Sequence, residues 1–309
     1  MSPQILVTTS AFAVADHGPV EHMEAAGYEV RLNPYGRRLT RAEILDLLAD
    51  EGVVGLVAGL EPLDREVLET SHLRVISRVG SGVSNVDLDA AHELGIEVHT
   101  TPDGPTSAVA ELTIGALLSL LRDIPSLNAD LKDGRWVKRT GGQIAGRTVL
   151  VVGFGRIGQR VAALLSAFEA EVLVCDPLAS AESTPFPVVS LSDGYSRADV
   201  ICFHNSGEDC VLSDQHLYQL KPGVLILNAA RGGVASESSL RRGLEEEIIG
   251  GVWLDVFETE PYTGSLTGHP RTLLTPHVGS YTSECRVKME GEAVRSLLAS
   301  LAGCRNNAS

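Results

Sequence analysis

Basic residues are scarce in this chain of 309 residues. It has 25 Lys and Arg against 40 Asp and Glu, which gives a formal net charge of −15 at pH 7. No block of Lys or Arg offsets this charge, so most of the surface would repel a polyphosphate backbone. The composition therefore argues against a nucleic acid as a partner.

Cysteines are also few. The chain has five, an odd number, and none lies in a C-x-x-C motif. This argues against a disulfide framework and against a zinc site, so we expect no bound metal. We expect the thiols to be reduced and mostly buried; they belong to Cys175, Cys202, Cys210, Cys285 and Cys304.

Long apolar runs are missing as well. None approaches the ~18 residues that a helix needs to cross a bilayer. The segment Met1 to Ser10 reads as a β-strand rather than as the basic stretch and apolar run of a secretory signal. We therefore expect a soluble cytoplasmic protein without a membrane segment.

Aromatic residues make up only 5% of the chain, whereas glycine is abundant at 31 residues and hydrophobic residues reach 44%. This balance suits many strand-to-helix turns around cores of Val, Leu, Ile and Ala, so it favours an α/β fold. At ~150 residues per domain, the length predicts about two domains, each with its own core.

Two series of short Val, Ile and Leu runs alternate with helical patterns, which is typical of doubly wound parallel sheets. The first series predicts strands at Gln4 to Thr8, Tyr28 to Leu32, Val53 to Ala58, Leu73 to Ser77 and Ile96 to Thr100. The second predicts strands at Arg147 to Gly153, Glu171 to Cys175, Asp199 to Phe203, Val224 to Asn228, Gly250 to Leu254 and Thr272 to Thr275.

Between the two series lies Ser107 to Arg122, whose apolar residues run almost all round a helix. Such a helix is buried, here between domains or subunits, and we expect a two-fold homodimer. The last helical segment, Thr282 to Ala302, is too short for a domain of its own and is expected to pack on the first domain. We therefore predict a substrate domain of residues 1–99 and 283–309, and a dinucleotide-binding domain of residues 100–282.

The strand RTVLVVG leads into Gly153-Phe154-Gly155-Arg156-Ile157-Gly158, and a helical stretch follows. This context is typical of a dinucleotide site, in which the glycines allow the tight turn, the approach of the pyrophosphate and close helix packing. Free N–H groups at the helix start would receive the phosphate charge. For the hexapeptide alone, a glycine-rich turn without a ligand is the alternative.

Asp176 stands at the end of the next strand, eighteen residues past Gly158. A carboxylate there can accept both ribose hydroxyls and would repel a 2′-phosphate. No arginine follows within several residues. NAD is therefore the expected cofactor rather than NADP.

Three polar residues stand just beyond the ends of late strands, where an open α/β sheet binds its ligands: Arg231, Glu260 and His277. Singly, each has a plain alternative. Arg231 could be a surface loop residue, and Glu260 could be a solvated charge beside Glu258. His277 could be a hydrogen-bonded histidine at a strand end. Together, in this order after a dinucleotide motif, they indicate a catalytic constellation.

Several stretches resemble the D-isomer-specific 2-hydroxyacid dehydrogenase family, most closely its short phosphoglycerate-dehydrogenase-like members. The likeness covers nearly the whole chain, and the matching stretches read RVGSGVSNVDLDAAHELGIEV, TSAVAELTIGALLSLLR, GRTVLVVGFGRIGQRVA, LKPGVLILNAARGG, LDVFETEP and TPHVGS. The resemblance implies a Rossmann NAD-binding domain inserted in a discontinuous flavodoxin-like substrate domain. It also implies an oxidoreductase that moves a hydride between NAD(H) and C2 of a small D-2-hydroxy acid or its 2-keto counterpart.

In such an enzyme Arg231 would clamp the substrate carboxylate and polarise the C2 oxygen. His277 would be the general acid and base, and Glu260 would hold its tautomer and favour the imidazolium. By resemblance, Ser81 and Gly82 offer backbone groups to the substrate carboxylate or the nicotinamide side. The implied nicotinamide pocket comprises Ala229, Ala230, Asp255, Gly279 and Ser280.

The chain departs from the family pattern after the strand Asp199 to Phe203, where a His and a Pro-Leu-Thr loop are usual. Here the sequence reads HNSGEDC and is shorter, and we expect His204 and Asn205 to contact the cofactor. Ser84 stands in place of a frequent Asp, and Tyr281 in place of a small residue. These departures bear on specificity more than on reaction type.

The sequence says least about the substrate. A phosphoglycerate enzyme needs cations near the distal phosphate. The candidates are Arg78, Arg37, Arg38 and, from a neighbouring subunit, Lys138 or Arg139. Glu61, however, puts an acid where a base is wanted. A phosphorylated or phosphonate-bearing acid stays open, as do two alternatives: an NAD-sensing, corepressor-like protein and a formate- or phosphite-type hydride donor enzyme.

Overall fold

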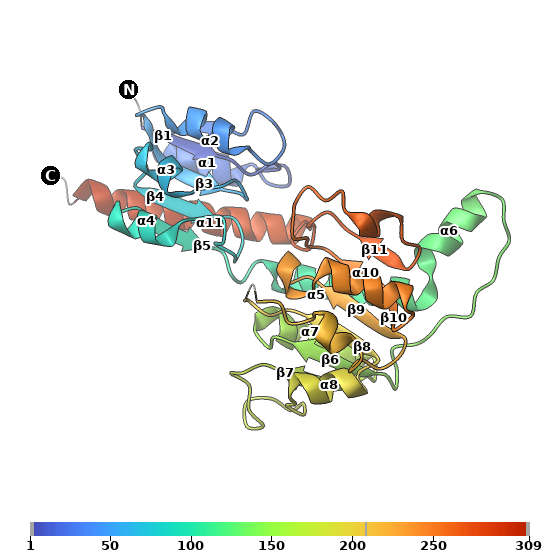
Figure 1. Cartoon of the computed structure of the whole chain (residues 1–309). Coiled ribbons are helices and arrows are strands. Elements are labelled where there is room, and N and C mark those ends of the chain that lie inside the picture. Colours follow the sequence, from blue (N-terminus) through green and yellow to red (C-terminus); the bar gives the residue numbers. More distant parts are fainter. Residues whose placement is uncertain (1–2, 208, 307–309) are drawn as a thin grey trace. The chain divides into compact units, whose positions relative to one another are not determined.

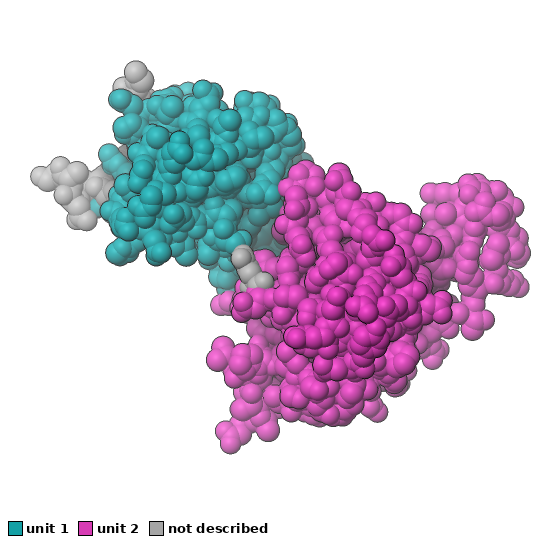
Figure 2. All heavy atoms as spheres, viewed as in Figure 1, with its two compact units in different colours: residues 1–105, 280–309 teal, residues 106–279 magenta. Residues whose placement is uncertain are grey.

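The computed structural model of the chain describes residues 3–207 and 209–306, with side chains through residue 303. It divides into two compact units, unit 1 (residues 1–105 and 280–309) and unit 2 (residues 106–279), coloured teal and magenta in Figure 2. Unit 1 is therefore discontinuous in sequence. In the described part of the chain, no helix is both long and apolar enough to span a membrane.

Unit 1 is built on a five-stranded parallel sheet in the order β2-β1-β3-β4-β5. Its strands are β1 (Gln4–Val7), β2 (Glu29–Leu32), β3 (Val53–Ala58), β4 (Val75–Arg78) and β5 (Glu97–Thr100) (Figure 1). The chain moves from β1 to β2 on one side and then to β3 on the other. This is the flavodoxin-like order, with its switch point between β1 and β3.

Helices cover both faces of this sheet, as a parallel sheet requires. They are α1 (Gly18–Ala25), α2 (Arg41–Leu48), α3 (Arg65–Glu69), α4 (Leu88–Glu93) and α11 (Ser283–Asn306). Helices α2, α3 and α4 pack around the core that contains Leu56 and Ile76. Helix α11 contacts β3, β4 and β5 from the other face, where Leu301 lies close above Gly55.

Unit 2 is built on a six-stranded parallel sheet in the order β11-β10-β9-β8-β6-β7. Its strands are β6 (Thr148–Val152), β7 (Glu171–Cys175), β8 (Val200–Phe203), β9 (Val224–Asn228), β10 (Ile249–Leu254) and β11 (Thr272–Leu274). Strand β6 lies between β7 and β8, so the switch point of this doubly wound sheet is at β6. The two parallel sheets confirm the predicted α/β fold.

The helices of unit 2 pack on its sheet in two core clusters, except α6, which contributes no residue to either cluster among the described residues. They are α5 (Pro105–Arg122), α6 (Ile124–Lys132), α7 (Arg156–Ala167), α8 (Leu191–Arg197), α9 (Asp214–Leu217) and α10 (Glu237–Glu245), with the 3₁₀ turns η1 (Gly232–Val234) and η2 (Ser265–Gly268). Helix α5 contributes Ile114, Leu117 and Leu121 to the cluster that contains Val149 and Trp253. The predicted apolar helix after the first sheet is thus confirmed.

The predicted strands are confirmed, with ends that move by one or two residues. The largest shift is at Leu73 to Ser77, which the structure places at Val75–Arg78. The reason is tertiary, because β4 takes its register from β3, where Gly55 pairs with Val75. Strand ends of this kind depend on the neighbouring strand rather than on local sequence.

The expected burial of the cysteines is only partly right. Cys202 and Cys285 are buried and Cys175 is half-buried, but Cys210 is exposed. The expectation is wrong for Cys210 because this residue lies in the surface loop after β8 rather than in a strand. All four are free thiols, and the side chain of Cys304 lies outside the described residues.

Candidate cofactor and catalytic site

The glycine motif lies at the carboxyl end of β6, at the switch point of the unit 2 sheet. Gly153 has a φ of +90°, and a Cβ on it would lie 2.4 Å from the backbone nitrogen of Asn205. A Cβ on Gly158 would lie 2.0 Å from the carbonyl oxygen of Gly153. Any other residue at these two positions would force the loop, β6 and α7 apart.

Gly155 differs from these two glycines, because a Cβ there would meet no atom within 4 Å. Gly155 is the N-cap of α7, and no side chain caps that helix start. The N–H groups of the first turn and the positive end of the helix dipole are therefore available to an anion, which fits a pyrophosphate. Beside them, Phe154 packs edge-to-face on Phe186, Ile157 is half-buried and Arg156 is exposed.

Asp176 follows β7 and turns its carboxylate toward the glycine loop. Its Oδ2 accepts a hydrogen bond from the backbone N–H of Phe154 at 2.6 Å, and its Oδ1 accepts one from Leu178 at 2.7 Å. A carboxylate has lone pairs beyond these two bonds, so it can still accept from ribose hydroxyls. Its negative charge beside the loop disfavours a 2′-phosphate.

His204 and Asn205 follow β8, next to the glycine loop. Both ring nitrogens of His204 and Oδ1 of Asn205 are buried, and none of the three has a hydrogen-bond partner in the described part of the chain. Burial lowers the pKa of His204 from 6.5 to about 4, so the ring is neutral at pH 7. Buried polar atoms without partners are uncommon and mark a place where a polar ligand fits.

Unit 2 brings Glu260 and His277 into contact from the loops after β10 and β11. The Nδ1 atom of His277 lies 2.9 Å from Oε2 and 3.1 Å from Oε1 of the carboxylate. Because a carboxylate only accepts, Nδ1 carries the proton and Nε2 is left to exchange one. The His277 side chain is 37% exposed, so a ligand can reach it.

The carboxylate of Asp255 stabilises the turn that carries His277 by accepting hydrogen bonds from it. His277 has a φ of +53°, which non-glycine residues adopt rarely and only where the surroundings enforce it. The buried Asp255 accepts hydrogen bonds at Oδ1 from Thr275 Oγ1 (2.6 Å) and from the N–H of Val278 (2.9 Å). Its Oδ2 accepts one from the N–H of Gly279 at 2.7 Å. Sequence reasoning missed this role of Asp255.

Arg231 follows β9 in a loop shaped by a buried asparagine. Asn228 accepts a hydrogen bond from the N–H of Ala230 at 3.0 Å and donates one to the carbonyl of Arg231 at 2.9 Å. The guanidinium of Arg231 donates to the carbonyl of Ala230 at 2.7 Å. A Cβ on Gly232 would lie 2.0 Å from the carbonyl carbon of Phe257, so only glycine lets this loop lie against the loop after β10. The signal that could have revealed Asn228 is a polar residue ending an apolar strand.

The residues expected around the nicotinamide ring are small. Ala230 and Gly279 are buried and Ala229 is half-buried, all three in unit 2. Ser280 begins the second segment of unit 1. Short side chains at the carboxyl ends of β9 and β11 leave room for a planar ring.

The other predicted substrate residues lie in unit 1, at the end of β4. The Nη1 atom of Arg78 donates to the carbonyl of Val79 at 2.6 Å. Gly80, with a φ of +133°, leaves the space that this guanidinium occupies, since a Cβ there would coincide with Nη1. Ser81 is exposed and Gly82 is half-buried.

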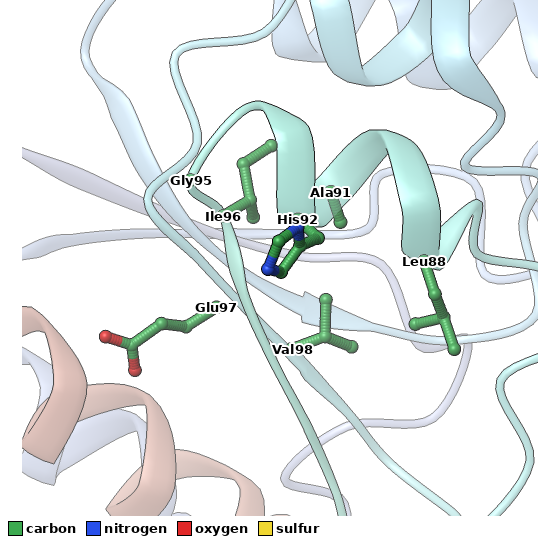
Figure 3. A pocket seen from close by; sticks show the side chains of 7 residues that line it. All are labelled: Leu88, Ala91, His92, Gly95, Ile96, Glu97 and Val98. Carbon is green, nitrogen blue, oxygen red and sulfur yellow. The ribbon is translucent and has the colours of Figure 1, made fainter.

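A cavity of about 470 Å³ in unit 1 lies apart from these residues, between α4 and the amino-terminal end of β5 (Figure 3). Its lining consists of Leu88, Ala91, His92, Gly95, Ile96, Glu97 and Val98. None of the predicted site residues is among them. Within residues 3–207 and 209–306 no group of three or more His, Cys, Asp or Glu side chains is arranged to hold a metal.

The chain has many relatives of known sequence. Residues 114–279 match the family described as D-isomer specific 2-hydroxyacid dehydrogenase, NAD binding domain. The chain is 38% identical over 258 residues to a D-3-phosphoglycerate dehydrogenase of Mycobacterium tuberculosis, a match that covers 80% of this chain and 49% of the relative. It thus spans about half the length of the curated relatives it matches.

Solved structures agree over almost the whole chain. A protein of Thermus thermophilus superposes with a TM-score of 0.88 at 33% identity, over 97% of each chain. A glyoxylate reductase from Paecilomyes thermophila gives a TM-score of 0.85 at 26% identity, over 97% of this chain and 95% of the other. The matched NAD-binding domain confirms NAD as the cofactor. Since that match covers more than half of its residues, the chain belongs to the D-isomer specific 2-hydroxyacid dehydrogenase family.

Proposed function

We propose that this chain is an NAD-dependent dehydrogenase that transfers a hydride between NAD(H) and C2 of a small D-2-hydroxy acid or its 2-keto counterpart. The observation that carries the proposal is the 2.9 Å contact between His277 and Glu260, in the same unit as a glycine loop that fits a dinucleotide. An NAD sensor on this fold can retain the same pair, so turnover of a keto acid is what separates the two functions.

NAD, when bound, supplies the hydride acceptor, and its reduced form the hydride donor. His277 takes the hydroxyl proton at Nε2 when the hydroxy acid is oxidised, and returns it when the keto acid is reduced. Glu260, at Nδ1, compensates the positive charge that the ring then carries. Asp255 fixes the turn that carries the ring, because it accepts hydrogen bonds from the hydroxyl of Thr275 and from the N–H groups of Val278 and Gly279.

Arg231 is proposed to hold the substrate carboxylate with its planar fork and to polarise the C2 oxygen. Its guanidinium has donors beyond the one bond to Ala230, so it can bind a bidentate anion. Arg78, Ser81 and Gly82 are proposed to contact the substrate as well. Among them, the backbone of Ser81 and Gly82 would bind the carboxylate.

Unit 2 is proposed as the dinucleotide-binding domain and unit 1 as the substrate domain. The pyrophosphate would lie on residues 153–158 and the ribose hydroxyls on Asp176. His204 and Asn205 would contact the cofactor through their orphaned polar atoms. The nicotinamide ring would lie beside Ala229, Ala230, Asp255, Gly279 and Ser280.

The names of the curated relatives make 3-phosphoglycerate the first acid to test, since they are called D-3-phosphoglycerate dehydrogenase. A phosphonate-bearing acid would likewise need cations near its distal anionic group. The glyoxylate reductase among the solved structures makes an acid without a distal anion the second.

We also propose a homodimer in the cytoplasm. Helix α6 and the segment after it expose large apolar side chains: Trp136 is 80% exposed, Leu131 58% and Ile124 50%. Large exposed apolar side chains along one segment favour a protein interface, and a two-fold axis is the usual symmetry. The free thiols of the four described cysteines accord with a reducing compartment. A monomer by light scattering at micromolar concentration would contradict the dimer.

The test of the proposed activity is a panel of 2-keto acids with NADH. It includes glyoxylate, hydroxypyruvate, 3-phosphohydroxypyruvate and a phosphonate-bearing keto acid, with formate and phosphite tested as donors to NAD. Oxidation of NADH by at least one keto acid supports the proposal. NADH binding by fluorescence without turnover of any panel member would favour an NAD sensor instead.

A further inference from the structure

The carboxyl edge of the unit 1 sheet carries a second cluster of buried polar groups. Thr8 and Thr9 follow β1, and residues 59–61 follow β3. These two strands flank the switch point of the sheet. Open α/β sheets bind their ligands outside the carboxyl ends of the strands at such a point. The cluster therefore stands where unit 1 would meet a ligand.

Glu61 is the charged member of this cluster and is fully buried. Its Oε1 accepts hydrogen bonds from the hydroxyl of Thr8 and from the N–H of Gly59, the latter at 3.1 Å. Its Oε2 and the hydroxyl of Thr9 are buried without a hydrogen-bond partner in the described chain. Asn85 donates to the carbonyl of Glu61 at 2.7 Å, so the loop is held from the segment after β4.

The free oxygen of Glu61 is suited to accept a hydrogen bond from a ligand. Burial raises the pKa of Glu61, whereas the hydrogen bonds from Thr8 and Gly59 and the charge of Arg78 act in the opposite direction. In either protonation state the group can pair with a hydroxyl. As a carboxylate in a buried site it would repel a second anion strongly.

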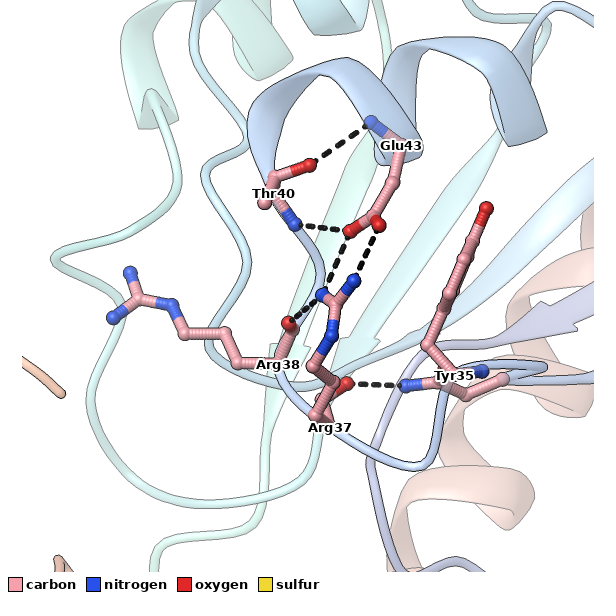
Figure 4. A network of polar contacts seen from close by, with 6 residues as sticks. Tyr35, Arg37, Arg38, Thr40 and Glu43 are labelled. Atoms are coloured by element: carbon pink, nitrogen blue, oxygen red, sulfur yellow. Dashed lines mark hydrogen bonds and ion pairs between the residues drawn. The ribbon is translucent and has the colours of Figure 1, made fainter.

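The cations that a distal phosphate would need are engaged with other partners. The two terminal nitrogens of Arg37 bond to the carboxylate of Glu43 at 2.9 and 2.6 Å (Figure 4). Arg139 lies 2.6 Å from Asp130 and 3.2 Å from Asp123. Both guanidinium groups would have to give up a carboxylate to bind a phosphate.

The remaining candidate cations are no better placed. Arg78 donates to the carbonyl of Val79 and lies in the field of Glu61, which offsets its charge. The guanidinium of Arg38 extends away from the contacts of Glu43 in Figure 4, and the side chain is exposed. Lys138 is exposed as well. Long exposed side chains lose much conformational freedom when they are fixed on a ligand.

We propose that Glu61 is a specificity-determining residue that selects substrates with a neutral, hydroxyl-bearing distal group and excludes a distal phosphate. The proposal rests on the proposed dehydrogenase function and deepens it. A distal hydroxyl donates to Oε2 of Glu61 and completes its hydrogen bonding. A distal phosphate meets an acidic side chain there, which repels it when ionised and which offsets the charge of Arg78.

The first experiment compares hydroxypyruvate with 3-phosphohydroxypyruvate, which differ only in the distal phosphate, using NADH and the full chain. We expect kcat/KM of the wild type to favour hydroxypyruvate by at least ~10-fold, since a buried polar group discriminates strongly between such analogues. A wild type that prefers the phosphorylated acid overturns the proposal without any variant.

The second experiment uses Glu61→Gln, which keeps the shape of the side chain and removes its charge. The preference for hydroxypyruvate should fall by about 10-fold, and inorganic phosphate should inhibit the variant more strongly than the wild type. The matched control is Glu51→Gln, an exposed residue in the turn before β3, which should leave both quantities unchanged. An unchanged substrate ratio in a folded Glu61→Gln protein overturns the proposal.

Failure of the proposed function gives a different result. If no keto acid is turned over, calorimetry on the NAD-bound protein compares glycerate with 3-phosphoglycerate. Tighter binding of glycerate still supports the role of Glu61, and tighter binding of 3-phosphoglycerate contradicts it. The absence of turnover would then count against the dehydrogenase activity alone.

Discussion

The two units share a parallel sheet with a switch point, but they line that point in different ways. In unit 2 the loop after β6 is shaped by glycines, and a Cβ on Gly153 or Gly158 would collide with backbone atoms. In unit 1 the loops after β1 and β3 are shaped by side chains, with Glu61 buried against Thr8. A backbone-lined site suits a cofactor whose charge is constant, whereas a side-chain-lined site can vary with the substrate.

Unit 1 depends on buried charge in a second place. Glu290 of α11 is 1% exposed and lies 2.6 Å from Nη2 of Arg286, while its Oε2 accepts a hydrogen bond from the N–H of Ala13 at 2.8 Å. Arg286 in turn donates to the carbonyl of Ala11 at 3.2 Å. This pair ties the loop after β1 to the C-terminal helix, so the second chain segment supports the first.

The largest effect on activity should come from removing the acid–base residue of unit 2, His277, while its cofactor site is left intact. His277→Ala should lower kcat by ~100- to 10,000-fold, as expected for the loss of a general acid and base. NADH affinity should stay near that of the wild type, because the glycine loop is untouched. Steady-state rates with a keto acid that the wild type reduces well, together with NADH fluorescence titration, measure both.

The control for this change is His72→Ala, which removes an exposed imidazole from unit 1. It should leave kcat unaltered. Near-wild-type turnover by His277→Ala would contradict the acid–base role.

The contrast between the units also explains what the sequence could predict. The glycine motif and Asp176 were recognisable because their chemistry requires particular residues at fixed spacing, and the structure places the Asp176 carboxylate 2.6 Å from the N–H of Phe154. The pairing of Glu260 with His277 was expected from the resemblance and is present in the structure. Features of this kind can be predicted from local sequence motifs.

Other features depend on tertiary burial and left no local trace. The sequence marks Glu61 as an acid where a phosphate site wants a base, but only the fold shows that its side chain is buried and that its Oε2 has no hydrogen-bond partner in the described chain. Asp255 reads as a ligand contact, but its carboxylate holds the turn of His277. Glu290 reads as one acid on an amphipathic helix, although the fold buries it beside the loop after β1. Contacts between residues far apart in the sequence cannot be predicted from the periodicity of hydrophobic residues.

The second effect in size concerns the buried pair of unit 1. Glu290→Ala leaves the guanidinium of Arg286 without its carboxylate, and breaking a buried pair from one side costs about 3 kcal/mol or more. Urea unfolding of the NAD-free protein measures the loss. Glu284→Ala removes an exposed acid from the same helix and should cost less than ~1 kcal/mol. Equal effects of the two changes would show that the burial of Glu290 is energetically unimportant.

The third effect sharpens the cofactor side of the comparison. With Asp176 beside the ribose, kcat/KM for NADH should exceed that for NADPH by at least ~10-fold, which is about 1.4 kcal/mol. Asp176→Ala should narrow this ratio and also weaken NADH binding, because the N–H of Phe154 loses its acceptor. Glu182→Ala, an exposed acid in unit 2, is the control. Equal kcat/KM for NADH and NADPH in the wild type would contradict the proposal that Asp176 selects NADH.

The smallest effect concerns the stability of unit 2 as a function of pH, and it tests whether burial of the His204 side chain destabilises the folded chain at low pH. Burial lowers the pKa of His204 in the folded chain from 6.5 to about 4. Between those two pH values the unfolded chain binds a proton at this residue that the folded chain does not. The free energy of unfolding should therefore fall by about 1 kcal/mol for each pH unit below 6.5, and the contribution is complete only above that pH.

His204→Gln keeps a polar side chain and removes this titration, so its unfolding free energy should depend less on pH over the same window. Urea unfolding of the NAD-free variant and wild type, at several pH values from about 7 to 5, gives the two slopes. The control is His72→Gln, which removes an exposed imidazole from unit 1 and should retain the wild-type slope. If His204→Gln kept the wild-type slope, the orphaned nitrogens of His204 would have to be solvated in the NAD-free protein. His204 would then carry no cost of burial, in contrast to the buried side-chain cluster around Glu61.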